Sequence, residues 1–125
     1  MIFDTDVLIW VQRGNEKAAR VIDQSNDRYV SVLTYMELLQ AAQNRKQQEY
    51  ITSFLGDLGF VTLPPTENIG HRAAVYVAEY TLSHGIRAGD AIIAATATEN
   101  NMALCSGNGK HYRAIQELKL KVFHP

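Results

Sequence analysis

Three acidic residues and an asparagine stand at comparable places along this chain, each beside a short apolar segment: Asp4, Glu37, Asp90 and Asn108. Carboxylates brought together at one place repel one another strongly unless a cation neutralises them. Hard divalent ions take oxygen ligands, and Mg²⁺ commonly uses one or two carboxylates together with water and phosphate oxygens. Such an ion polarises a phosphodiester and activates water for attack on it. The acidic residues therefore predict metal-assisted hydrolysis if the fold gathers them.

Short β-branched runs alternate with segments whose apolar residues recur at helical spacing, which is typical of α/β proteins. The pattern predicts strands over residues 1–4, 28–32, 60–63, 102–105 and 121–123, the last at an edge. It predicts helices between them, including 45–58, 90–98, 110–118 and a long helix that stops at Gly85. The expected fold is a three-layer α/β domain over residues 1–125, with a short, mostly parallel central sheet flanked by helices. Ligands bind such sheets beyond the carboxyl ends of the strands, near the switch in strand order, where the four polar residues would converge.

Each of these residues also has a purely structural interpretation. Asp4 is suited to cap the first helix. Thr34 and Glu37 have the spacing of a capping box, in which Glu37 would only satisfy a helix end. Asp90, which precedes five apolar residues, is either a helix cap or a partly buried charge that needs a partner. Asn108 lies in a Ser-Gly-Asn-Gly segment typical of a turn, and the residues alone leave these alternatives open.

Composition indicates the class of protein and limits its partners. The chain has 125 residues, a net charge of −1, one cysteine (Cys105) and no apolar run long enough to span a bilayer. These features predict a cytoplasmic protein with no disulfide and no membrane partner. Proteins that bind nucleic acid by charge alone are usually basic, so a metal or a local patch would have to offset phosphate charge here. Four histidines lack metal-ligand spacing and are expected at the surface or the core edge: His71, His84, His111 and His124.

Four segments resemble the motifs of the PIN-domain family, most closely those of the VapC toxins of bacterial toxin–antitoxin pairs. Residues 2–9 resemble the opening motif, in which an apolar strand ends in Asp-Thr-Asp or Asp-Thr-Asn. Residues 31–39 resemble the second motif with its glutamate, and residues 104–112 resemble the fourth. Residues 85–97 (GIRAGDAIIAATA) resemble the third motif and are the most specific of the set. The order, spacing and total length match over essentially the whole chain.

The resemblance implies an endoribonuclease that depends on Mg²⁺ or Mn²⁺ and cleaves RNA phosphodiester bonds. Its catalytic residues would be Asp4, Glu37 and Asp90. Of these, Asp4 and Asp90 would be the main protein contacts to the metal, and Glu37 would position or deprotonate the attacking water.

Three further residues would support this site by the same resemblance: Asp6, Ser106 and Asn108. Ser106 stands where threonine is common in the family, and its hydroxyl would still hydrogen-bond a water on the metal. Many relatives carry an aspartate where Asn108 stands. Because an asparagine cannot neutralise a second cation, the sequence leaves open whether one or two metal ions bind.

The helix predicted over residues 45–58, from the spacing of Tyr50, Phe54 and Leu58, also indicates a partner. Its apolar face is wider than one small sheet requires, and the preceding helix adds more apolar side chains. The residues concerned are Tyr50, Ile51, Phe54, Leu55 and Leu58, with Leu38, Leu39 and Ala42. One interpretation is that all of them pack into the core of the domain. The other, implied by the VapC resemblance, is a homodimer whose groove receives an amphipathic antitoxin segment that inhibits cleavage.

Other functions fit the sequence less well. Residues 4–7 also resemble the first motif of haloacid-dehalogenase-type phosphatases, but those enzymes need an aspartate four residues after Gly-Asp, where Ala94 stands. A receiver-like signalling module needs an aspartate after its central strand, where this chain has Leu63-Pro64-Pro65. The alternative that stays open is a PIN-domain RNA-processing nuclease without a toxin role.

Overall fold

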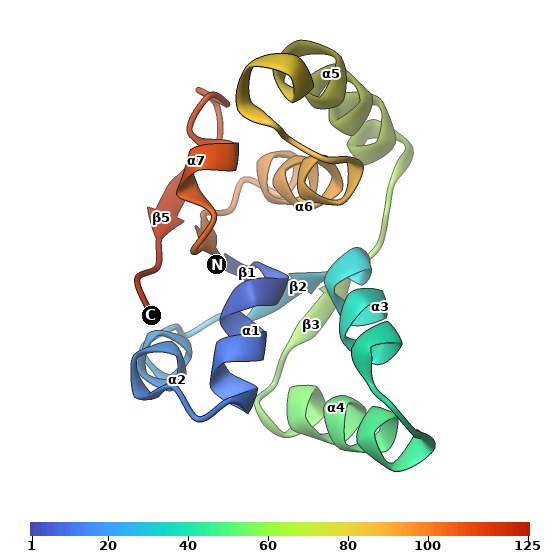
Figure 1. Ribbon diagram of the computed structural model, residues 1–125, viewed down its shortest axis with the longest axis vertical. Helices are drawn as coiled ribbons and strands as arrows, with labels where there is room; N and C mark the ends of the chain where they lie inside the picture. Colours follow the sequence, from blue (N-terminus) through green and yellow to red (C-terminus); the bar gives the residue numbers. More distant parts are fainter.

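Five short parallel strands form one sheet, and seven helices surround it (Figure 1). The computed structural model describes all 125 residues. The strands are β1 (Ile2–Phe3), β2 (Tyr29–Ser31), β3 (Val61–Leu63), β4 (Leu104–Ser106) and β5 (Leu120–Val122). Their order is β3-β2-β1-β4-β5, so the chain builds outward from β1 to one edge and then resumes on the other side of β1. The switch in strand order therefore lies between β1 and β4, where α/β proteins place ligands.

The helices form a layer on each face of the sheet (Figure 1). Helices α5 (Glu67–His84), α6 (Ala88–Glu99) and α7 (Gly109–Tyr112) lie on one face, and α1 (Thr5–Gln12), α2 (Glu16–Asp23), α3 (Val32–Ala41) and α4 (Arg45–Asp57) on the other. Successive residues of a strand point to opposite faces. Ile2 and Leu104 accordingly belong to the core beneath α5 and α6, whereas Phe3 and Cys105 belong to the other core. The predicted three-layer α/β fold is confirmed.

The long helix α5 and the apolar helix α6 follow the sequence pattern closely. Helix α5 ends at Gly85, which has the left-handed φ of 71° that glycine adopts without strain. In α6, the side chains between Ala91 and Ala97 are buried with one exception, the half-buried Ile92. None of the helices combines the length and the apolar character that a bilayer span requires.

The C-terminal part departs from the prediction. The prediction of a helix over residues 110–118 is wrong, because α7 ends at Tyr112. Tight turns follow, in which the Ile115 amide donates to the Tyr112 carbonyl and the Leu118 amide to the Ile115 carbonyl. These turns carry Ile115 and Leu118 into the core beneath α5 and α6. Strand β4 also starts and ends later than predicted, because Asn101 takes a left-handed φ of 53° after α6 and pairing with β1 begins only at Leu104.

The buried face of α4 also differs from the predicted stripe. Ile51 and Leu55 are the buried residues of this helix, whereas Phe54 and the adjoining Leu58 are half-buried against the same core. Tyr50 is 60% exposed. The interpretation that these side chains pack into the domain's own core therefore holds for all of them except Tyr50.

Candidate active site

Asp4 lies directly after β1 and is only 3% exposed. Its Oδ1 accepts a hydrogen bond from the Thr5 amide at 2.8 Å, so Asp4 does cap α1. Its Oδ2 accepts hydrogen bonds from the Ser106 hydroxyl at 2.7 Å and the Tyr112 hydroxyl at 3.1 Å. Ser106 ends β4, which pairs with β1, so the strand pairing brings these two residues together. Asp4 is thus a helix cap and also part of a cluster of polar side chains beyond the carboxyl ends of β1 and β4. Open α/β sheets bind ligands in a crevice at this position, and we call this cluster the crevice.

Two carboxylates at this edge of the sheet are poorly neutralised. Burial, followed by the negative charge of Asp6, raises the pKa of Asp4 from 3.8 to about 6, although three hydrogen bonds oppose the shift. Burial also raises the pKa of Asp6, and the charge of Asp90 adds to this. Asp6 Oδ2 accepts a hydrogen bond from the Gly107 amide at 2.8 Å, but its Oδ1 is buried without a partner. A bound cation would neutralise the buried charges of Asp4 and Asp6 and would give the unpartnered Asp6 oxygen a partner.

The loop after β4 is shaped by close contacts with these side chains. A Cβ at Gly107 would lie 2.5 Å from Asp6 Oδ2, so only a glycine lets this backbone amide approach Asp6. The Asn108 amide donates to the Ser106 hydroxyl at 3.0 Å. The Asn108 side chain is exposed and does not cap α7. The turn interpretation therefore accounts for the backbone of Asn108, while its side chain stays exposed.

Asp90 enters the same crevice from the first turn of α6. Its Oδ2 accepts a hydrogen bond from the Arg87 amide at 3.2 Å, so it contributes to capping the helix. The fully buried Tyr112 places its hydroxyl 3.4 Å from Asp90 Oδ1 while it also contacts Asp4. A phenol has one proton, so Tyr112 donates to one carboxylate at a time. This hydroxyl is the point at which Asp4 and Asp90 meet.

Glu37 approaches from α3 and is more exposed than the two aspartates. The Thr5 hydroxyl lies 2.8 Å from Glu37 Oε1 and 3.0 Å from the Thr34 hydroxyl. The capping-box interpretation of Glu37 is wrong, because Ser31 caps α3 by accepting the Leu33 amide and Glu37 lies inside the helix. Since Thr5 adjoins Asp4, its hydroxyl connects Glu37 to the crevice.

Three contributors to the crevice were missed from the sequence: Thr5, His111 and Tyr112. His111 was expected at the surface or the core edge, but its Nδ1 lies 3.4 Å from Asp90 Oδ2. That nitrogen is buried and has no well-formed hydrogen bond, so the contact is an ion-pair distance only. All three residues lie inside segments that resemble PIN motifs. The contacts of His111 and Tyr112 depend on the single turn of α7, which directs these two adjacent side chains toward Asp90.

The donor set of the crevice fits a hard cation. It consists mainly of carboxylate and hydroxyl oxygens, including the desolvated Asp4 and the unpartnered oxygen of Asp6. No three His, Cys, Asp or Glu side chains lie close enough together to enclose an ion. An ion here would therefore be held by one or two carboxylates and complete its shell with water or phosphate oxygens, as Mg²⁺ usually does.

Removing only the hydroxyl of Tyr112 tests its contacts with the two aspartates. Tyr112→Phe is expected to lower the free energy of unfolding of the metal-free protein by about 1–3 kcal/mol, because a buried carboxylate loses a donor. Urea denaturation at pH 8 without divalent ions measures the effect. Tyr29→Phe is the control, since the Tyr29 hydroxyl makes no hydrogen bond within the protein. An equal effect in both variants would contradict a bridging role.

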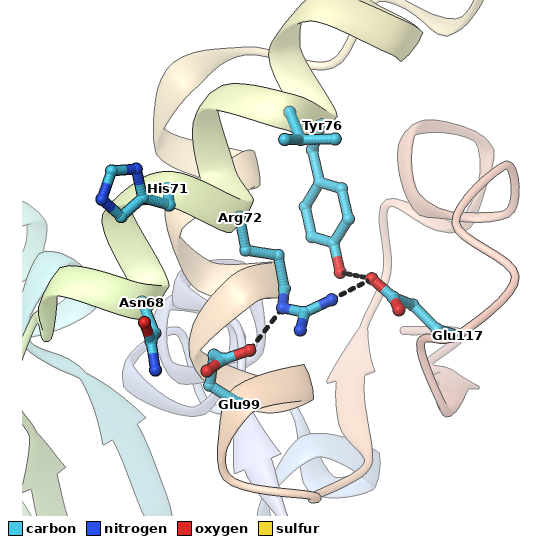
Figure 2. A pocket seen from close by; sticks show the side chains of 7 residues that line it. Asn68, His71, Arg72, Tyr76, Glu99 and Glu117 are labelled. Carbon is cyan, nitrogen blue, oxygen red and sulfur yellow. Dashed lines mark hydrogen bonds and ion pairs between the residues drawn. The ribbon is translucent and has the colours of Figure 1, made fainter.

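A hollow of about 440 Å³ lies away from this crevice, beside the far end of α6. Figure 2 shows Arg72 between Glu99 and Glu117, with the Tyr76 hydroxyl also donating to Glu117. Asp90 is in the first turn of α6 and Glu99 is its last residue, so they are about 14 Å apart along the helix. The paired charges tie α5 to the end of α6 and to the segment after α7, which is a structural role.

Comparisons with known proteins agree with the fold. The sequence profile of the PIN domain matches residues 1–117. A toxin–antitoxin complex from Klebsiella pneumoniae contains a chain with 25% identity and a TM-score of 0.80, over 94% of this chain and 93% of that chain. VapBC-1 from nontypeable Haemophilus influenzae contains one with 25% identity and a TM-score of 0.76, over 98% of both chains. FitAcB from Neisseria gonorrhoeae contains another, with 25% identity and a TM-score of 0.71 over 95% and 94%. A comparison with curated protein sequences finds no significant match.

Proposed function

The chain belongs to the PIN-domain family, whose members are typically metal-dependent nucleases, and from this premise we propose that it is a Mg²⁺- or Mn²⁺-dependent endoribonuclease. In this proposal it acts in the cytoplasm, as a single domain, as the toxin of a toxin–antitoxin pair. The observation that carries the proposal is the meeting of Asp4 and Asp90 at the Tyr112 hydroxyl, beyond the switch between β1 and β4.

The proposed chemistry divides the acidic residues by their environment. Asp4 and Asp90 would hold the metal ion, which when bound polarises the phosphodiester and makes water more acidic. Glu37 would act as the base: the Thr5 hydroxyl fixes Oε1, and Oε2 makes no hydrogen bond within the protein and is able to accept the proton of the attacking water.

The supporting residues would fix this arrangement. Ser106 orients Asp4 through the 2.7 Å hydrogen bond, and Asp6 anchors the loop after β4 through the Gly107 amide. The exposed amide of Asn108 would contact water or substrate beside the ion. Because Asn108 brings no charge, one metal ion is the simpler occupancy.

Inducing the protein in cells and mapping new RNA ends tests the proposed activity. We expect cleavage at defined positions in wild-type cells and none with Asp90→Asn. The alternative, an RNA-processing nuclease without a toxin role, predicts cleavage without growth arrest and without an inhibiting partner. The absence of any new RNA ends would contradict both forms of the proposal.

An apolar hollow of about 330 Å³ between α1, α3 and α4 supports the proposed antitoxin contact. Its apolar lining residues are Ile9, Leu38, Ala41, Ala42, Tyr50 and Ile51. The similar chains from Klebsiella and Haemophilus come from complexes with antitoxins. A second apolar hollow, between α5 and the start of α6, offers a separate surface for the proposed homodimer.

Tyr50→Glu is expected to weaken the complex with the antitoxin by about thirtyfold or more, because a charge replaces an aromatic anchor at an apolar groove. The fold should be unaffected, since Tyr50 is 60% exposed. Leu82→Glu, at a fully exposed position on α5, is the matched control. Co-purification with the product of the neighbouring gene, followed by titration, measures the affinity. Equal binding by both variants would place the antitoxin elsewhere.

A further inference from the structure

A further hollow, of about 260 Å³, lies between α2 and the C-terminal end of the chain. Its rim carries Lys17 and Arg20 from α2, Lys121 from β5, and His124. We call this feature the basic hollow. Figure 1 shows the C-terminus beside α2, so residues from opposite ends of the sequence form one surface.

No ion pair within the protein neutralises the charge of the basic hollow. Lys17, Arg20 and Lys121 are exposed, and no ion pair in the protein involves them. Helix α2 also carries Glu16 and Asp23, but neither lines the hollow. The whole chain has 12 Lys and Arg residues against 13 acidic ones, so a carboxylate-free group of three permanent cations is a local exception. Such a group of cations attracts an anionic ligand.

The basic hollow adjoins the acidic crevice through the sheet. Lys121 pairs in register with Cys105, the residue before Ser106. The Phe123 amide donates to the Ser106 carbonyl at 2.8 Å, and His124 follows directly. Neighbouring strands lie about 4.8 Å apart, so β5 is one strand from β4 and two strands from β1. A polymer that crosses the crevice beyond β1 and β4 and leaves toward the β5 edge of the sheet would therefore pass near the basic hollow.

We propose that the basic hollow binds the phosphodiester backbone of the RNA substrate next to the acidic crevice. This inference rests on the proposed ribonuclease function. The crevice itself repels phosphates, and a single metal ion neutralises only the one at the cleaved bond. The flanking phosphates need cations from the protein, and Lys17, Arg20 and Lys121, which form no ion pair within the protein, would provide them. These contacts are made to the RNA backbone and not to the bases. The basic hollow would therefore increase the affinity for RNA without adding sequence preference.

Binding of a labelled single-stranded RNA by protein carrying Asp90→Asn, which is expected to prevent cleavage, tests the proposal. Arg20→Gln/Lys121→Gln is introduced into this background. The matched control is Arg45→Gln/Lys46→Gln, which removes the same charges from exposed positions on α4. At low salt the first pair is expected to weaken RNA binding roughly tenfold or more, and to reduce the slope of log K against log salt by about 1.4. The control pair should leave affinity and slope near those of the parent.

Equal affinity and slope in the two double variants would overturn the proposal. Loss of antitoxin binding in Arg20→Gln/Lys121→Gln, with RNA binding unchanged, would also overturn it and make the hollow a protein-docking surface. Failure of the ribonuclease proposal is distinguishable, because wild-type protein would then cleave no RNA whatever the binding results. Melting temperatures of both double variants confirm that the comparison is between folded proteins.

Discussion

Asp90→Asn is expected to abolish RNA cleavage, with a loss of at least about a thousandfold, while the protein stays folded. The substitution removes a charge that would hold the metal and keeps the size of the side chain. It also removes repulsion with Asp6, so the stability of the metal-free protein should be unchanged or higher. Glu37→Gln is expected to lose activity as well, because an amide cannot accept the proton of the attacking water.

Cleavage is measured with Mg²⁺ and with Mn²⁺, alongside thermal melting of each variant. Glu49→Gln, an exposed glutamate on α4, controls for the loss of one carboxylate. The two substitutions should differ in metal binding: Asp90→Asn weakens Mn²⁺ affinity, whereas Glu37→Gln leaves it largely intact. Substantial cleavage by either variant, after contaminating nuclease has been excluded, would remove the assigned role.

Raising the pH from about 4 to about 6 is expected to remove the contribution of Asp4 to the stability of the metal-free protein. The pKa of Asp4 is about 6 in the folded protein against 3.8 ordinarily, mainly because the carboxyl is buried. The folded state then binds this proton more tightly than the unfolded chain does, so the contribution of Asp4 to stability is greatest below pH 4, falls through this interval and is level above it. The shift corresponds to about 3 kcal/mol. Above pH 6, Mn²⁺ should restore stability by replacing the proton as the neutralising charge.

Urea denaturation across this pH range, with and without Mn²⁺, measures the effect as the difference between wild type and Asp4→Asn. Other titrating groups, including Glu117 with its lowered pKa, cancel to first order in that difference. The variant should be more stable than wild type at pH 8 without metal, since the Ser106 and Tyr112 hydroxyls are able to accept from an amide. Mn²⁺ should also raise the stability of this variant only slightly. A variant that is less stable at pH 8 would show that the ionised Asp4 is adequately neutralised by its hydrogen bonds.

The sequence by itself determined the elements and the class of the fold. Alternating periodicities located the five strands and most of the helices to within a few residues, because the helical and strand repeats are local properties of the chain. The position of Asp90 before an apolar helix and of Asp4 after an apolar strand likewise required no knowledge of distant contacts. A parallel sheet then followed from the helices between strands, and with it the expectation that strand ends converge.

The tertiary structure alone decided which side chains meet. Tyr112 reaches Asp4 only because β4 pairs with β1 and α7 stops after one turn, and the periodicity of residues 110–118 indicated a longer helix. His111 gave no signal by spacing, yet the same turn brings it to Asp90. The basic hollow joins Lys17 to Lys121 across nearly the whole chain. Such contacts depend on strand order and on the packing of particular side chains across long separations, whereas sequence patterns report only the period and the polarity of each segment.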